Sequence, residues 1–466
     1  MRLILHGAAR TVTGSQHLIE INGQHLLLEC GMFQGRRAEA AQRNCCFPFA
    51  PKDIDAVILS HAHIDHSGNL PNLVKQGFNG AIYTTHATAD LADIMLRDSG
   101  HIQEEDADYL NRKKRRHGEP LIKPLYTIED AARVARMFKG VGYDSPFEPV
   151  KGVTARLFDA GHILGSAAVQ LELEEKGRKT GFWFSGDIGR YKLPLIPDPV
   201  MPFGAELVLM ECTYGDRAHD DPEAAYQKFR DIVLRTIRRG GKVIVPAFAV
   251  GRTQELVFSL NRMLADGELP RDLPVFVDSP LAIEATRVFS RHPEFFDLET
   301  FEFIQQARHP ALSFPSLSYT RAVEDSKAIN QMDKPMVIIS ASGMAENGRI
   351  LHHLKNNIGD PRNTICIVSW QAPYTLGRRL AEREPIVRIF GEEYKLKAEV
   401  ATVNGLSAHA GQNLLLRYAK TAAENGAKRF VLVHGDAQPA QVFTELLARE
   451  GINNVSYPEA GTTFDL

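Results

Sequence analysis

The stretch from Ala56 to Gly68 reads A-V-I-L-S-H-A-H-I-D-H-S-G, and the rest of the chain is organised around it. Its first four residues are apolar and partly β-branched, which predicts a short strand buried on both faces. Three histidines and an aspartate follow, and an amphipathic run over 70–75 predicts a helix behind them. Imidazole nitrogens and carboxylate oxygens are ligands that Zn²⁺ accepts. The candidate zinc ligands are therefore His61, His63, Asp65 and His66.

The spacing within this run favours two metal ions over one. Alternate side chains of an extended segment share a face, so His61 and His63 can point at the same ion. Where the chain turns helical, Asp65 and His66 project to a different side. Two adjacent ions stabilise both the attacking and the leaving oxygen in phosphoryl transfer. A chance gathering of surface or core histidines is the alternative, and four ligand-type residues in six positions argue against it.

Several later strands are predicted to end in the same way. His162 and Asp187 each follow an apolar strand and are flanked by glycines, which let the backbone turn tightly and approach a ligand. Glu211 ends another predicted strand, His409 lies in a loop of small residues, and His434 follows a strand near the C-terminus. Repetition of one design at several strand ends indicates a shared site.

Composition limits the class of protein. A chain of 466 residues is long enough for two or three domains, and 44% hydrophobic and 24% charged residues are typical of globular proteins. The net charge of −3 gives no overall attraction to nucleic acid, so a polyanion must bind at a local basic patch. The run R-K-K-R-R at Arg112–Arg116 is one such patch, although runs of this kind are usually solvated faces.

Cysteine content and hydropathy predict a cytoplasmic protein without membrane contact. The five cysteines are an odd number without paired spacing, which favours a reducing compartment. The first ten residues lack the apolar core of a signal peptide. No segment approaches the ~20 apolar residues that a membrane helix needs.

From residue 206 onward, predicted strands alternate with predicted helices. This alternation indicates a parallel sheet with binding sites at the carboxyl ends of its strands. The loops at those ends contain serines, glycines and arginines, which are suited to holding phosphate oxygens near helix N-termini. The candidate substrate-binding residues there are Arg252, Ser342, Gly343 and Arg349.

Taken in order, these motifs resemble the metallo-β-lactamase superfamily, and more narrowly its β-CASP RNA-nuclease branch, which includes the nuclease subunit of the pre-mRNA cleavage and polyadenylation factor and ribonuclease J. The likeness covers essentially the whole chain. The run His61–His66 matches the H-x-H-x-D-H motif. His162 and Asp187 match the third and fourth motifs, and Glu211 and His409 match motifs A and C.

The resemblance implies an α/β fold in which a metallo-β-lactamase αββα sandwich carries an inserted β-CASP domain with a parallel sheet. The long gap between Asp187 and His409 leaves room for that insertion. The expected borders place the sandwich at residues 1–208 and 390–466, and the β-CASP domain at residues 209–389.

The resemblance also implies a zinc-dependent ribonuclease that hydrolyses RNA with a metal-bridging hydroxide, in a cleft between the two domains. The ligands of one zinc would be His61, His63, His162 and Asp187, and those of the other Asp65, His66, His409 and Asp187. Asp65 would also orient the hydroxide. Where the family's motif B often has a histidine, this sequence has Arg379, a candidate phosphate-binding residue. Glu211 with His434 is then expected to protonate the leaving oxygen.

Two other functions remain open from the sequence. The same ligands would serve a two-zinc hydrolase of a small-molecule ester or phosphodiester, although such an enzyme does not need the long insertion. A non-catalytic RNA-binding subunit is the other alternative, although all seven ligand positions are filled. The expected partner is single-stranded RNA. The sequence is compatible with a homodimer and does not distinguish endonuclease from 5′-exonuclease, or RNA from DNA.

Overall fold

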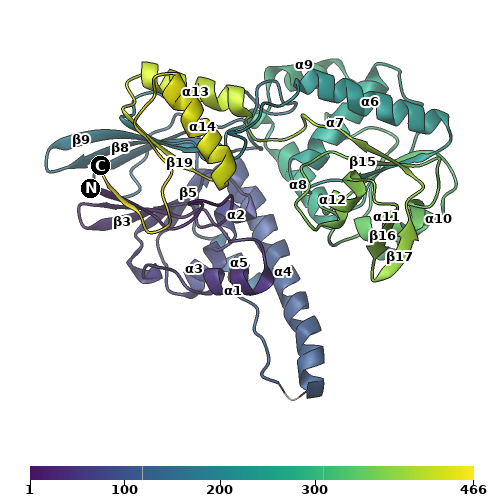
Figure 1. Cartoon of the computed structure of the whole chain (residues 1–466), viewed down its shortest axis with the longest axis horizontal. Coiled ribbons are helices and arrows are strands. Elements are labelled where there is room, and N and C mark those ends of the chain that lie inside the picture. Colours follow the sequence, from purple (N-terminus) through teal and green to yellow (C-terminus); the bar gives the residue numbers. More distant parts are fainter. Residues whose placement is uncertain (118, 308) are drawn as a thin grey trace. The chain divides into compact units, whose positions relative to one another are not determined.

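The strand predicted before the histidine-rich run is β4 (Ala56–Ile58), which lies in a sheet between two parallel neighbours. The computed structural model describes residues 1–117, 119–307 and 309–466 (Figure 1). The chain divides into two units. Unit 1 comprises Met1–Tyr191, Asp198–Ala218 and His409–Leu466, and unit 2 comprises Lys192–Pro197 and His219–Ala408. The domain borders expected after residues 208 and 389 stay a prediction.

Unit 1 contains two sheets. The first has the order β21-β1-β2-β3-β4-β5-β6 and is formed, besides β4, by β1 (Arg2–Leu5), β2 (His17–Ile21), β3 (Gln24–Leu28), β5 (Ala81–Thr85), β6 (Phe138–Val141) and β21 (Thr463–Asp465). The second has the order β20-β19-β10-β9-β8-β7 and is formed by β7 (Val153–Asp159), β8 (Ala167–Glu175), β9 (Arg178–Phe184), β10 (Leu207–Glu211), β19 (Arg429–Val433) and β20 (Val455–Ser456).

One apolar core lies between these sheets. It joins residues of the first sheet, such as Leu26 and Ile58, to residues of the second, such as Val169 and Leu209, and all four are fully buried. Burial of apolar surface at about 25 cal/mol per Å² is the main force that holds two such layers together. The layers bring the carboxyl ends of β4, β9, β10 and β19, with the loops that follow them, into one unit.

Helices cover the outer faces of both sheets. On the first sheet lie α1 (Arg37–Cys45), α2 (Ile64–Ser67), α3 (Leu70–Lys75), α4 (His86–His117) and α5 (Ile128–Val134), of which α4 packs against β5 and β6. On the second sheet, α13 (Gln412–Glu424) and α14 (Ala437–Arg449) lie beside β19, as Figure 1 shows. Helix, sheet, sheet and helix form the predicted sandwich.

Unit 2 is built around a six-stranded sheet whose paired strands are all parallel. Its order is β13-β12-β14-β11-β15-β18, with β11 (Lys242–Pro246), β12 (Val275–Val277), β13 (Leu317–Tyr319), β14 (Met336–Ser340), β15 (Thr364–Ile367) and β18 (Glu399–Thr402). The remaining elements are α6 (Pro222–Arg238), α7 (Arg252–Ala265), α8 (Pro280–Arg291), α9 (Leu298–Gln306), α10 (Val323–Gln331), α11 (Ile350–Asn357), α12 (Leu376–Ala381) and the hairpin of β16 (Ile386–Ile389) and β17 (Glu392–Lys395). The predicted α/β fold with a parallel inserted sheet is confirmed.

Two predicted elements differ from the structure. The sequence predicts a helix from Thr88 to about Ser99, but α4 continues to His117. Half of residues 101–110 are good helix formers, and Ala107 and Asn111 are buried. The sequence also predicts a helix from Ile128 to Phe138, but α5 ends at Val134, because Phe138 begins β6 and pairs with β5. Of the basic run on α4, the side chains of Lys113 and Arg116 lie outside the described residues.

Among the described residues, the helices fall short of the length and apolar content that a bilayer crossing needs. The cytoplasmic location stays a prediction.

Candidate metal centre

The predicted metal ligands converge in unit 1 from the ends of several strands. His61 and His63 lie in the loop after β4, and Asp65 and His66 lie on α2. The other ligand-type residues come from loops after β7, β9 and β19 and before α13, and are His162, Asp187, His434 and His409. β19, β10 and β9 are neighbours in the second sheet, so residues at their carboxyl ends meet at one edge.

A first group consists of His61, His63, His162 and Asp187, whose ligand atoms all lie within 4.8 Å of one another. The Nδ1 atom of His63 is 3.2 Å from Nε2 of His61 and 3.2 Å from Nε2 of His162. Asp187 Oδ2 lies 3.5 Å from Nε2 of His61 and 3.6 Å from Nε2 of His162. Three imidazoles and one carboxylate oxygen therefore face a common point.

A second group consists of Asp65, His66 and His434. Nε2 of His434 is 3.3 Å from Nε2 of His66 and 3.4 Å from Oδ2 of Asp65. The other oxygen of Asp187, Oδ1, lies 3.3 Å from Nε2 of His66. Asp187 therefore presents one carboxylate oxygen to each group.

The chemistry of these atoms fits zinc. Asp187 Oδ1 is buried without a hydrogen-bond partner among the described residues, and such an atom is costly unless something else binds it. Burial holds the pKa of His61 and His162 well below the ordinary value and lowers the pKa of His63 to about 4. Neutral imidazoles have a lone pair to donate, so the first group is suited to a divalent cation.

The charge of the two aspartates supports the same conclusion. Burial raises the pKa of Asp187, but the nearby imidazoles of His434, His66 and His409 outweigh burial and hold that pKa well below the ordinary value. Burial likewise raises the pKa of Asp65, but the hydrogen bond from His434 and the charges of His66 and His434 together outweigh burial and hold that pKa below the ordinary value. Both carboxylates are therefore ionised, as metal ligands must be.

Glu29 holds His66, and through Ser60 also His61, by the ring nitrogens that face away from the metal groups. Its buried carboxylate lies 2.5 Å from Nδ1 of His66, and it accepts hydrogen bonds from the backbone N–H and the hydroxyl of Ser60. The Ser60 hydroxyl in turn lies 2.9 Å from Nδ1 of His61. One carboxylate thus orients one histidine of each group, which is the usual role of residues behind metal ligands.

His409 is held differently from His434. Its Nδ1 is 3.1 Å from Oε1 of Glu211 and 3.9 Å from Oδ2 of Asp187. Glu211 is itself fixed, because its Oε1 accepts a hydrogen bond from the N–H of Ile188 at 2.7 Å. Burial lowers the pKa of His409, but the charges of Glu211 and Asp187 raise it to about 9. Among the described residues, His434 therefore groups with Asp65 and His66, whereas His409 groups with Asp187 and His434.

The predicted substrate-binding residues all lie in unit 2. Each of the three arginines has an internal acidic partner: Arg252 pairs with Glu255, Arg349 with Asp278 at 2.6 Å and Arg379 with Glu384 at 2.8 Å. Ser342 and Gly343 lie in the loop after β14. A guanidinium already paired with a carboxylate has less charge to offer a phosphate, and the substrate-binding role of these residues stays a prediction.

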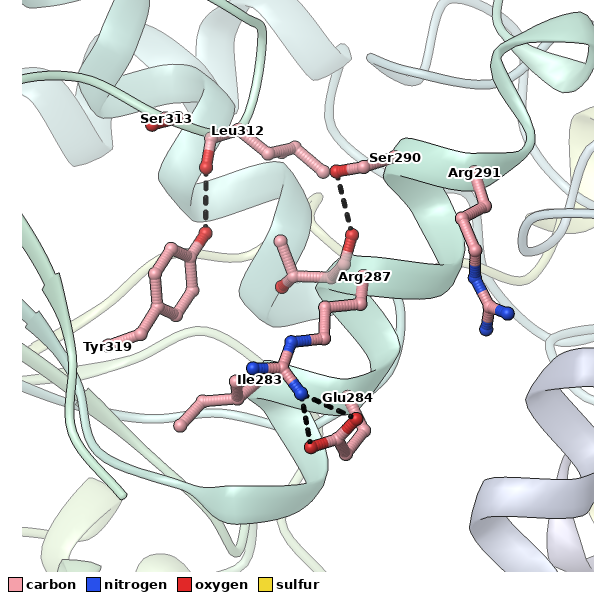
Figure 2. A pocket seen from close by; sticks show the side chains of 9 residues that line it. Ile283, Glu284, Arg287, Ser290, Arg291, Leu312, Ser313 and Tyr319 are labelled. Atoms are coloured by element: carbon pink, nitrogen blue, oxygen red, sulfur yellow. Dashed lines mark hydrogen bonds and ion pairs between the residues drawn. The ribbon is translucent and has the colours of Figure 1, made fainter. Parts of the chain in front are cut away.

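A pocket of about 660 Å³ lies elsewhere in unit 2, beside α8 (Figure 2). Its lining consists of Ile283, Glu284, Thr286, Arg287, Ser290, Arg291, Leu312, Ser313 and Tyr319. Within it, the Tyr319 hydroxyl donates to the carbonyl of Leu312, and Arg287 pairs with Glu284, as Figure 2 shows. None of the predicted site residues lines this pocket.

Three family models match the chain. The model of the metallo-beta-lactamase superfamily matches residues 9–247, that of the Beta-Casp domain residues 253–380, and that of the Zn-dependent metallo-hydrolase RNA specificity domain residues 393–458.

Similar proteins cover nearly the whole chain. "Ribonuclease TTHA0252" of Thermus thermophilus is 38% identical over 97% of this chain and 97% of its own length. "RNase J-like protein" of Methanocaldococcus jannaschii is 29% identical over 93% of this chain and 92% of its length. "Transcription termination factor FttA" of the same organism is 29% identical over 96% of this chain and 69% of its own length.

A solved structure, a protein of unknown function from Enterococcus faecalis V583, matches with a TM-score of 0.57 at 14% identity, over 100% of this chain and 99% of that one. At this identity the likeness concerns the fold alone.

Proposed function

This chain belongs to the metallo-β-lactamase superfamily, in the branch that also carries a β-CASP and an RNA-specificity domain, and we propose that it hydrolyses phosphodiester bonds of single-stranded RNA with two zinc ions. It is a metal-dependent ribonuclease by class. The observation that supports two ions is the position of Asp187, whose Oδ2 faces the first group and whose Oδ1 faces the second.

We assign one zinc to the first group and the other to the second group together with Asp187. Zinc, when bound, lowers the pKa of water and stabilises negative charge on phosphate oxygens. Glu29 keeps His66 oriented for its ion through the contact at Nδ1. Asp65 is ionised and its Oδ2 lies 3.4 Å from Nε2 of His434, so its carboxylate would bind the second ion together with His66 and His434.

His409 with Glu211 is the proposed proton donor for the leaving oxygen. Because Nδ1 of His409 contacts the Glu211 carboxylate, the ring is held in place at the edge of the metal groups, and the neighbouring carboxylates favour its protonated form. Arg379 does not suit this role, because a guanidinium stays protonated and this one already binds Glu384. This division exchanges the roles that the sequence indicated for His409 and His434.

The test is cleavage of single-stranded RNA labelled at the 5′ or the 3′ end by zinc-loaded protein. We expect cleavage by wild type, a zinc content of about two per chain, and product sizes that distinguish endonuclease from exonuclease. Asp187→Ala should lose zinc and at least about 10³-fold in kcat. The matched control is Asp144→Ala, at an exposed aspartate of unit 1 that pairs with Arg156.

Other outcomes separate the alternatives. Turnover of a small ester without cleavage of any RNA would identify a small-molecule hydrolase. Two bound zinc ions without turnover of either substrate would identify a non-catalytic RNA-binding subunit. An Asp187→Ala protein that keeps both ions and full activity would overturn the assignment of the bridging ligand.

A further inference from the structure

Three aromatic side chains are exposed at the carboxyl edge of the parallel sheet in unit 2. Phe248 follows β11 and is 45% exposed, and Trp370 follows β15 and is 49% exposed. Tyr374 lies four residues further along and is 98% exposed. β11 pairs directly with β15 and with β14, so these loops are neighbours. The carboxyl edge of a parallel sheet is where α/β proteins bind ligands.

The loops that carry these rings are fixed to one another through the loop after β14. A Cβ on Gly343 would lie 3.0 Å from the ring of Phe248, so this ring packs against a backbone that only glycine leaves open. On the other side, the side-chain amide of Gln371 donates to the carbonyl of Gly343 at 3.0 Å. Contacts at Gly343 therefore join the loop that carries Phe248 to the loop that carries Trp370 and Tyr374.

The backbone of Tyr374 is unfavourable for a tyrosine. The N–H of Thr375 donates to the carbonyl of Ala372, which closes a turn with Pro373 and Tyr374 at its centre. Tyr374 has a φ of +70°, and the third position of such a turn favours glycine. Because its ring is almost fully exposed, packing within the protein does not offset this cost. Strain of this kind at an exposed residue indicates a role in binding.

We propose that Phe248, Trp370 and Tyr374 form a stacking platform that binds nucleobases of single-stranded RNA. This inference rests on the proposed function, because it concerns the same substrate. Exposed aromatic rings bind single-stranded nucleic acid without strict sequence preference, since every base has a π face. Ser369 and Thr375, which flank Trp370 and Tyr374 in the chain, are polar and partly exposed. Separate rings with polar neighbours suit single bases better than they suit the continuous apolar surface of a protein partner.

The test measures binding of an RNA dodecamer of mixed adenosine and uridine, labelled with fluorescein at its 3′ end, to the full-length protein in EDTA, which prevents hydrolysis. We expect Tyr374→Gly, Trp370→Ala and Phe248→Ala each to weaken binding about 5-fold or more, as loss of one stacked base does. Tyr374→Phe keeps the ring and should bind within twofold of wild type. A dodecamer of the same length without bases should bind wild type and variants equally.

Stability and fluorescence separate a binding role from a structural one. Tyr374→Gly relaxes the turn, so its melting temperature should stay the same or rise while its RNA affinity falls. The chain has two tryptophans, and Trp183 is fully buried in unit 1. RNA should therefore change the emission of Trp370, and this change should disappear in Trp370→Phe.

The matched control is Phe390→Gly. Phe390 is also an exposed aromatic residue of unit 2, at 53%, with a positive φ of +53°, but it lies in the turn between β16 and β17. Its loss should leave RNA affinity unchanged. Wild-type RNA affinity in Tyr374→Gly and Trp370→Ala would contradict the stacking platform. This holds even if these variants lose binding to a protein partner, since the proposal concerns RNA. Cleavage of RNA by the wild type tests the proposed function separately, so the two failures are distinguishable.

Discussion

At the scale of single residues, His409 and His434 divide the chemistry of the metal centre between them. The ring of His434 lies among Asp65, His66 and Asp187, whereas His409 is held by Glu211. We expect His434→Ala to reduce the zinc content from about two to about one per chain. We expect His409→Ala to keep both ions and to lower kcat by about 10²–10⁴-fold, the usual contribution of a general acid. Zinc analysis beside single-turnover cleavage measures both effects.

The opposite pattern would restore the roles that the sequence indicated. If His409→Ala lost one zinc and His434→Ala kept both, His409 would be the ligand. His25→Ala, at a half-exposed histidine of β3, is a suitable control and should change neither readout.

A second prediction concerns Asp278, which has no part in the metal centre. This aspartate is buried at the end of β12 and contacts Arg349 at 2.6 Å, His353 at 2.7 Å and Ser326 at 2.5 Å. Burial raises its pKa, but these three hydrogen bonds outweigh burial and leave the pKa below the ordinary value. The folded chain therefore binds fewer protons here than the unfolded chain. Its contribution to stability is complete above about pH 4 and is lost as the pH falls through the folded-state pKa.

Asp278→Asn should consequently lower the free energy of unfolding at pH 7 by about 3 kcal/mol, because it leaves Arg349 and His353 without their anion. It should also flatten the dependence of unit 2 stability on pH below 4. Urea unfolding between pH 3 and pH 7 measures both. Asp272→Asn, at an exposed aspartate of the same unit, is the control and should change neither the stability at pH 7 nor its dependence on pH. Equal acid sensitivity of Asp278→Asn and wild type would contradict the prediction.

The set of ligand-type residues could be predicted from the sequence, but their division could not. Strand–loop patterns located His61, His162 and Asp187, since each follows a buried strand. The grouping of His434 depends on β19 pairing with β10, which in turn pairs with β9, and this is a property of the sheet order. His434 also has a φ of +47°, which the sequence does not reveal because this residue is not glycine. The one available signal was its position directly after a predicted strand.

At the scale of elements, the loops that hold the metal centre touch one another through glycines. The N–H of Gly189, after β9, donates to the carbonyl of Ala160, after β7, at 2.7 Å. A Cβ on Gly189 would lie 1.7 Å from the carbonyl oxygen of Gly161. The loops that position Asp187 and His162 can therefore approach only because this residue has no side chain.

Gly189→Ala should force these two loops apart. We expect a loss of about 2 kcal/mol or more in stability from overpacking, together with weaker zinc binding, because the neighbouring ligands no longer converge. Chelator competition measures the zinc affinity and urea unfolding the stability. Gly359→Ala is the control, since a Cβ there would meet nothing within 4 Å. Wild-type zinc affinity in Gly189→Ala would show that the loop contact does not position the ligands.

Element boundaries followed the sequence where packing and local preference agree. The sequence predicts a hairpin turn at Asn22–Gly23, because N-G between two apolar runs suits the positive φ of such a turn, and β2 and β3 pair across it. The helix predicted over 70–75 also forms, with Leu70 and Leu73 buried. The helix predicted over 128–138 is wrong at Phe138, because this residue belongs to a strand that forms only by pairing with β5. Such pairing joins residues distant in the chain, and local periodicity does not report it.

At the scale of the whole molecule, the two units are unequal in their dependence on metal. All residues of the first and second groups belong to unit 1, and unit 2 contributes none of them. An ion that binds only the folded state stabilises the unit that binds it by about 4 kcal/mol when present at a thousand times its Kd. Metal should therefore change the stability of unit 1 far more than that of unit 2.

The two tryptophans allow this to be measured in the intact chain, because Trp183 reports on unit 1 and Trp370 on unit 2. In Trp370→Phe, chelation should lower the thermal midpoint of Trp183 emission by roughly 8–16 °C. The reason is that loss of the ion removes about 4 kcal/mol of stability, and each kcal/mol shifts the midpoint by about 2–4 °C. In Trp183→Phe, the midpoint of Trp370 emission should move by less than about 2 °C on the same scale. Equal shifts of both reporters would show that the units unfold as one cooperative body. A shift of Trp370 alone would place the stabilising ion in unit 2 and contradict the assignment of the metal centre.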